Sequence, residues 1–132
     1  MNDVKDRPLP PVLRSRKYSA PDIIEDWGLG WHLGRVVEYL EASTFKAFPI
    51  DDLRAAREHL IRKITVLGEF REDDPMPASR ASIGPKDIVR DWDLSVPLAG
   101  VLAVIYGRRQ YDVDMLSEAL SFLERRIAVM EV

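Results

Sequence analysis

The sequence predicts an all-α fold: a six-helix bundle made of two pseudo-two-fold repeats of a three-helix unit. Three observations lead to this prediction. Apolar residues recur every three or four positions in several segments, capping and helix-breaking residues separate these segments, and the pattern of the first half returns in the second. The 132 residues are 46% hydrophobic and 31% charged, which is ordinary for one globular domain.

The chain divides into four parts. Residues 1–17 carry several prolines and no apolar period, so we expect an extended or disordered arm. Residues 18–68 form the first helical repeat, and residues 86–132 form the second. Residues 69–85 contain prolines, serines and acidic side chains, which indicates a linker. We expect the two repeats to bury their apolar faces against each other and to fold as one compact domain.

Each repeat is expected to contain a short, a middle and a long helix. In the first repeat Ser19 can cap the short helix and Pro21 suits its first turn, while Gly28 and Gly30 break it. The long helix is expected to end at Gly68. In the second repeat the spacing predicts helices over 87–92, over 97–106 and from 112 nearly to the C-terminus.

The two halves share a sequence and not only a helical spacing. A shift of 65 positions places Trp27 on Trp92, within a pattern Asp-Ile-x-x-Asp-Trp-x-Leu that occurs in both halves. A shift of 63, reached by one two-residue change in a predicted loop, places Leu60 on Leu123 in the long helices. We expect these four side chains to lie in the core, because large aromatic and leucine side chains at helical spacing usually anchor packing.

The middle helix of the second repeat has no charged residue from Val96 to Tyr106. A helix that is apolar all round is buried on every side. It is therefore either the spine of the monomer or part of a contact between chains. The interpretation favoured here is a contact between chains, with these four residues in the interface: Leu98, Val101, Leu102 and Ile105.

The segment P-D-I-I-E-D-W-G-L-G-W-H-L-G-R-V-V-E-Y-L, followed by I-D-D-L-R-A-A-R-E-H-L-I-R-K-I, resembles the SaV-like domain of unknown function found mainly in bacteriophage proteins. The likeness covers residues 18–64 and, more weakly, 86–127. That family includes a phage nucleotide kinase without an ordinary phosphate-binding loop. The resemblance therefore implies phage ancestry and nucleotide handling. In this chain Arg35 stands where the family has asparagine, and Lys46 alone can replace its loop lysine.

No catalytic, metal or cofactor motif is evident. The chain lacks a G-x-x-x-x-G-K-[ST] loop and has no cysteine, and His32 and His59 have no companions that make a ligand set. Glu38 and Glu41 resemble half of the magnesium site of all-α nucleoside triphosphate pyrophosphohydrolases. On the next helix Glu58 is suitably placed, but Ile61 stands where that site needs a second acid.

The function expected is that of a non-enzymatic helical interaction or assembly module that binds itself or a larger protein. The first alternative is a nucleotide-binding or nucleoside monophosphate kinase-like protein, and the second is a degenerate pyrophosphohydrolase-like protein. For an anion or nucleotide, the candidate residues are Lys46, Arg108, Arg109 and Arg35. A net charge of −3 argues against nucleic acid as a partner. The absence of long apolar stretches argues against a membrane, and the absence of cysteine suits the cytoplasm.

Overall fold

The computed structural model describes residues 16–70, 81–106, 108 and 110–131, and within these residues all regular structure is helical. The predicted all-α class is confirmed. Most of the predicted arm and linker lies outside the described residues. The helices are α2 (Ala20–Trp27), α3 (Trp31–Ser43), α4 (Ile50–Phe70), α5 (Pro85–Trp92), α6 (Val96–Ile105) and α7 (Val113–Glu131).

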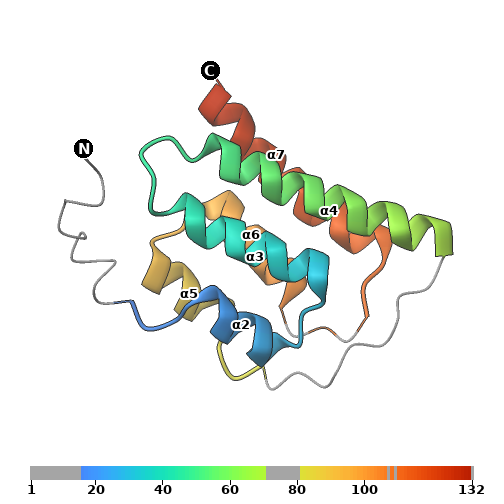
Figure 1. Ribbon diagram of the computed structural model, residues 1–132, viewed down its shortest axis with the longest axis horizontal. Coiled ribbons are helices and arrows are strands. Elements are labelled where there is room, and N and C mark those ends of the chain that lie inside the picture. The colour runs from blue at the N-terminus through green and yellow to red at the C-terminus, as the bar shows by residue number, and fades with distance from the viewer. Residues whose placement is uncertain (1–15, 71–80, 107, 109, 132) are drawn as a thin grey trace.

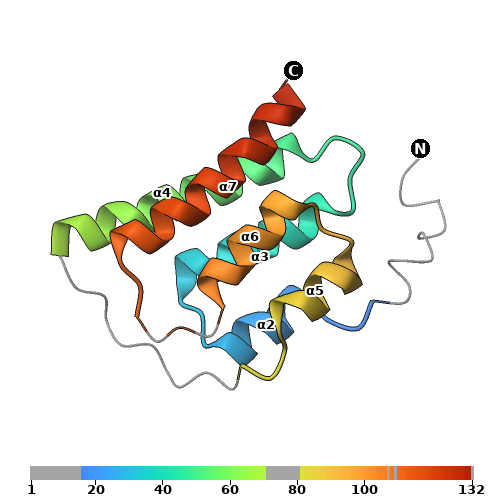
Figure 2. The same ribbon diagram turned by 180° about the vertical axis from the view of Figure 1, so that it is seen from behind.

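The helices lie in three layers of two, as Figures 1 and 2 show from opposite sides. The long helices α4 and α7 pack against each other in one outer layer. The middle helices follow, with α3 packed mainly against α4, and α6 mainly against α7. The short helices α2 and α5 form the third layer, and each contacts the middle helix that follows it in the chain.

Local signals explain where the short helices begin and end. The Ser19 side chain accepts a hydrogen bond from the Asp22 amide, and the Asp22 carboxylate accepts one from the Ser19 amide, which completes a capping box. α2 ends at Gly28, which has the left-handed φ of 64° that glycine adopts without steric cost. α5 ends at Asp93, which has a similar φ of 54°. The prediction that α4 ends at Gly68 is wrong, because this exposed glycine remains helical and α4 continues to Phe70.

Two tryptophans at the ends of the short helices tie the halves together. Trp27 Nε1 donates a hydrogen bond to the Ile83 carbonyl at 2.7 Å, and Trp92 Nε1 donates one to the Tyr18 carbonyl at 2.9 Å. The 65-residue shift converts the first contact into the second. Each indole therefore reaches the backbone that precedes the short helix of the other half. Both tryptophans are buried, as are Leu60 and Leu123.

The aspartates beside these tryptophans bind the same two backbone segments. The Asp26 carboxylate accepts hydrogen bonds from the Ile83 amide at 2.9 Å and from the Ser82 hydroxyl at 2.6 Å. The Asp91 carboxylate accepts hydrogen bonds from the Tyr18 amide and from the Lys17 amide, both at 2.9 Å. We call the contacts of these two aspartates and of Trp27 and Trp92 the reciprocal clasp. It gives the repeated Asp-Trp pair a structural role.

The four residues predicted to contact another chain lie inside a single chain instead. Val101, Leu102 and Ile105 have no exposed surface, and Leu98 is only 5% exposed. These side chains are already enclosed by the chain's own helices and have no surface left for a second chain. The lack of charge at these four positions follows from their burial between α5, α3 and α7, whereas Val96 and Ala103 on the other face of α6 are exposed.

Gly100 allows α6 to lie close to α7. A Cβ atom at this position would meet the ring of Phe122 at 2.8 Å, closer than such atoms approach in practice. Gly34, in α3, is different, because a Cβ atom there would lie at an ordinary 3.5 Å from Ile24. The two buried helices therefore carry glycine for different reasons, and only Gly100 is required by packing.

Trp92→Ala is expected to lower the free energy of unfolding by about 3–5 kcal/mol, as large core truncations do. Trp92 is 1% exposed and its indole N–H is bonded. Phe48→Ala is the matched control, since Phe48 is 87% exposed and its loss should cost about 0.5 kcal/mol or less. Denaturant titrations of both variants test this. Similar losses at the two positions would contradict the structure.

Gly100→Ala and Gly34→Ala are expected to change stability in opposite directions. Alanine is favoured over glycine inside a helix by about 1 kcal/mol, and at Gly34 this gain should be realised. At Gly100 the clash with Phe122 should reverse it, with a net loss of about 1–3 kcal/mol. Thermal and denaturant unfolding of the two variants measure the signs. A stabilised Gly100→Ala protein would mean that α6 and α7 are not in close contact.

Candidate functional site

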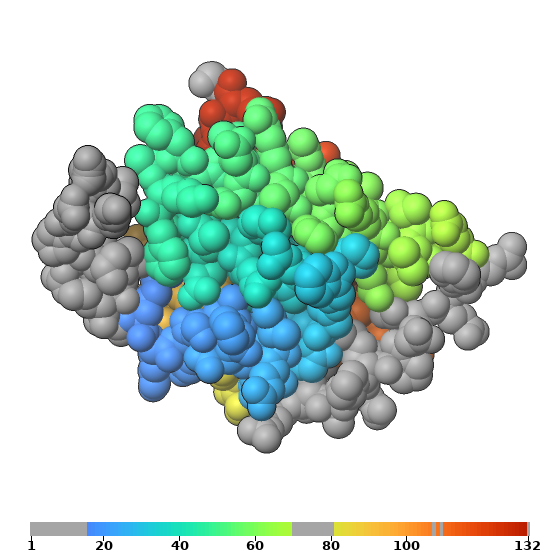
Figure 3. Space-filling view, viewed as in Figure 1, coloured from blue at the N-terminus to red at the C-terminus, as the bar shows by residue number. Residues whose placement is uncertain are grey.

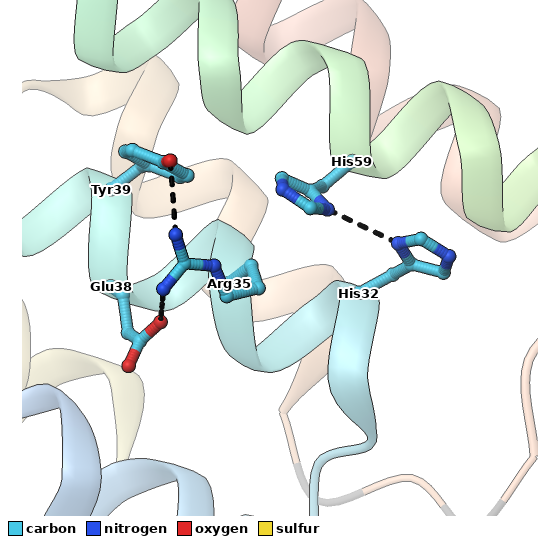
Figure 4. A network of polar contacts seen from close by, with 5 residues as sticks. All are labelled: His32, Arg35, Glu38, Tyr39 and His59. Atoms are coloured by element: carbon cyan, nitrogen blue, oxygen red, sulfur yellow. Dashed lines mark hydrogen bonds and ion pairs between the residues drawn. The ribbon is translucent and has the colours of Figure 1, made fainter.

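One connected group of aromatic and charged side chains lies on the surface where α3 meets α4. Figure 4 shows five of its members from close by, and the sixth is an exposed tryptophan at the start of α3. In the space-filling view, α3 and α4 lie open on the face turned to the viewer (Figure 3). We call this group the α3–α4 surface cluster, and it consists of Trp31, His32, Arg35, Glu38, Tyr39 and His59.

Arg35 is the centre of the cluster. Its guanidinium donates to Glu38 Oε1 at 2.7 Å and to the Tyr39 hydroxyl at 3.0 Å. The same group lies 5.0 Å from the centroid of the Tyr39 ring and 5.5 Å from that of Trp31, within the range of cation–π attraction. The hydrogen bonds that Arg35 donates to Tyr39 and Glu38 raise its pKa. The guanidinium is thus held in place with both aromatic rings beside it.

The two histidines bond to each other across the helices. His32 Nδ1 and His59 Nδ1 are 3.1 Å apart, and the His59 ring stacks on Tyr39 with centroids 5.9 Å apart. One nitrogen must donate and the other accept, so at least one ring is neutral in this contact. Burial lowers the pKa of both histidines, and nearby cations lower it further, Arg62 among them. The pair therefore resists protonation.

Trp31 is the most exposed aromatic residue of the cluster, at 70%, with its ring edge-on to His59 at 6.5 Å. The residues found at the matching positions of the second half are aliphatic or aromatic, or are glycine, and none is charged: Val96, Pro97, Gly100, Ala103, Val104 and Phe122. The fold is thus built in the second half without any of these polar groups. The cluster is a feature of one half only.

The residues predicted to bind an anion do not come together. Arg35 belongs to the surface cluster. Lys46, in the loop between α3 and α4, forms an ion pair with Asp52 at 2.9 Å, and Arg108, after α6, donates to the Val104 carbonyl. These two loops lie at opposite ends of the long-helix layer (Figures 1 and 2). Arg109 lies outside the described residues.

The acidic residues considered for magnesium are also engaged separately. Glu38 pairs with Arg35, and Glu58 pairs with Arg62 at 3.4 Å. Glu41 accepts a hydrogen bond from the Ala20 amide at 3.1 Å, and its burial raises the pKa of its carboxyl group. Within the described part of the chain no three histidine, aspartate or glutamate side chains are grouped to hold a metal ion.

Sequence reasoning included Arg35 but missed Trp31 and Tyr39 as its partners. A signal was present, because the three residues are spaced four apart and therefore share one helical face. The contrast between the two halves was a second signal, since the cluster occupies positions at which the aligned residues differ most in chemistry.

No family model, curated protein sequence or solved structure matches the chain. Among the described helices, none combines the length and apolar character needed to cross a bilayer.

The histidine pair is expected to make stability fall as the pH is lowered from about 7.5 to about 5.5. Both histidines have a folded-state pKa below the ordinary value of about 6.5. As the pH falls, the unfolded chain therefore binds protons before the folded chain does, and this lowers the free energy of the unfolded state relative to the folded state. His59→Phe, which introduces the residue found at the aligned position in α7, should flatten this dependence. Glu41 titrates in both proteins and cancels in the comparison. Equal pH slopes in urea titrations would contradict this account.

Proposed function

We propose that the protein is a non-enzymatic helical interaction module that binds through the α3–α4 surface cluster. The exposure of Trp31 beside Arg35 and Tyr39 carries the proposal. Tryptophan, tyrosine and arginine are the residue types that most often dominate the energy of protein interfaces. Here Arg35 and Tyr39 are joined by a hydrogen bond and Trp31 lies beside Arg35, so little freedom of the arginine and tyrosine side chains is lost when a partner covers them.

The bonding within the cluster supports binding in preference to acid–base chemistry. The histidine nitrogens nearest each other form a mutual contact, and Glu38 is occupied by Arg35. The donor histidine keeps a lone pair on Nε2, but the lowered pKa of both rings makes them weak bases. Trp31, by contrast, offers a large apolar surface without a described partner that covers it.

A second copy of the chain is the partner to which this proposal commits. Two-fold dimers are the commonest soluble assemblies, and their interfaces must be complementary to themselves. Arg35 and Glu38 form an ion pair within the chain that is about one-third exposed at each side chain, so a two-fold axis beside it can set two such pairs against each other with opposite charges facing. Trp31 would supply apolar area at the centre of such a contact.

We also propose that the chain arose by duplication of a three-helix unit. The order of short, middle and long helices occurs twice, and the contacts of the reciprocal clasp are related by the 65-residue shift. The left-handed helix ends at Gly28 and Asp93 are related by the same shift. Phage ancestry is a further proposal, and it rests on the likeness of residues 18–64 to the SaV-like domain.

Trp31→Ala is expected to convert a dimer into a folded monomer, and light scattering at micromolar to submillimolar concentration measures this. Loss of a central aromatic residue should weaken association by about 2 kcal/mol or more. Val96→Ala is the matched control, because Val96 is 84% exposed at the aligned position of α6. A parent protein that stays monomeric throughout this range would refute self-association. Equal weakening by both substitutions would show that the cluster is not the interface.

A further inference from the structure

A small cleft lies away from the surface cluster, where the segment before α2 meets the turn between α5 and α6. It has a volume of about 180 Å³. Its lining includes Ser43 and Thr44 from the end of α3 and Leu98 from α6. Three further lining residues carry the argument below, and they are Arg16, Ser95 and Arg126.

Several polar atoms of this cleft are buried without a partner. Arg16 Nε, Arg16 Nη1, Arg126 Nε and Ser95 Oγ are all shielded from solvent and form no hydrogen bond within the described residues. Buried polar groups are nearly always bonded, so each exception calls for an explanation. Three of these four atoms are cationic donors and the fourth is a hydroxyl. Such a group of donors is suited to one anion, and its two guanidinium groups outnumber the one carboxylate of the lining, which is that of Asp93.

The cleft is built to hold Arg16 in place. Its guanidinium lies 4.3 Å from the centroid of the Phe45 ring, and Nη2 reaches the Trp92 carbonyl at 3.5 Å. Asp91 and Glu41 are close enough to raise its pKa, although burial has the larger effect and lowers it. Both carboxylates accept hydrogen bonds from backbone amides, and neither is bonded to Arg16 in the described structure. Arg16 thus has two buried donors that no group of the described chain satisfies.

The fold itself does not require these polar groups. The sequence shifts that align the two halves place Ala81 opposite Arg16, Gly30 opposite Ser95 and Lys63 opposite Arg126. The other half therefore forms the same turn without the first arginine or the hydroxyl. A polar set that is costly to bury, and whose arginine before the short helix and hydroxyl before the middle helix are both missing at the matching positions, is better explained by a ligand than by packing.

We propose that this cleft binds a phosphate group, either as inorganic phosphate or as the phosphate of a small monoester. Two guanidinium groups supply the fork-shaped donors that match phosphate oxygens, and the Ser95 hydroxyl adds a further donor. Ser95 also precedes α6, whose positive end favours an anion. The volume is well below the roughly 300 Å³ at which ordinary ligand pockets begin. The cleft therefore holds a phosphate group, with any ester substituent outside it near Phe45.

Titration of the full chain with inorganic phosphate at constant ionic strength, followed by amide NMR shifts, tests the proposal. We expect saturable one-to-one binding, with shifts concentrated at residues 94–98 and around Arg126. Glycerol phosphate in a parallel titration distinguishes the two sources, since the tighter binder identifies which form the cleft prefers. Acetate and chloride should bind more weakly. Acetate that binds as tightly as phosphate, or a response that never saturates, would overturn the proposal.

Arg126→Gln is expected to raise the dissociation constant for phosphate about tenfold or more, because a charge-assisted contact is lost. Arg125→Gln is the matched control: it removes the same charge from the neighbouring position of α7, where the side chain is exposed over Phe122. Ser95→Ala is a milder second variant, because the Ser95 side chain makes no capping bond whose loss would destabilise α6. It should also weaken binding. Equal weakening by Arg125→Gln and Arg126→Gln would show nonspecific attraction and refute the site.

Discussion

The reciprocal clasp is the interaction on which the rest of this structure depends. Each short helix is preceded by an extended backbone segment whose amides and carbonyls need partners once they are covered. Those partners come from the opposite half, through Trp27 and Asp26 on one side and Trp92 and Asp91 on the other. Neither half can satisfy its own segment with these groups. The two halves are thus joined by exchanged polar contacts as well as by a shared apolar core.

Once the clasp and the core are shared, the remaining positions are free to differ. The halves place similar apolar residues along the inner faces of their helices and diverge at outward or marginal positions. At Arg35 and His59 the first half has a polar cluster, whereas Gly100 and Phe122 allow close packing of α6 on α7 in the second. The cleft takes a polar residue from each half, since Arg16 of the first corresponds to Ala81 and Ser95 of the second corresponds to Gly30. The two proposed binding sites lie at positions where the halves differ. The features that the halves share are explained by folding alone.

The local parts of the fold could be predicted from the sequence, and the sites could not. Helix positions follow from apolar spacing, and Gly28 ends α2 as expected. The prediction that α4 ends at Gly68 failed because glycine can also adopt helical φ and ψ, and no neighbouring group crowds this position. The paired residues of the sites are distant in sequence. His32 and His59 are 27 residues apart, and Arg16 and Arg126 line the same cleft only because of tertiary packing. Periodicity reports the face of a helix, but not what lies across from it.

The charge-free sequence of α6 also shows that a helix's own sequence does not reveal which element packs against it. Its composition indicates burial on every side, but composition cannot tell whether the cover comes from the same chain. The structure decides this for the inward face of α6, because α7, α5 and α3 of the same chain cover it. The clasp joins α2 and α5 in the layer beneath α3 and α6. The segment held by Asp91 also contributes Arg16 to the phosphate cleft. A ligand that bonds Arg16 would therefore stabilise the clasped state, because it binds only when that segment is in place. The surface cluster, formed by α3 and α4 alone, has no such dependence, so the two proposed sites can be tested separately.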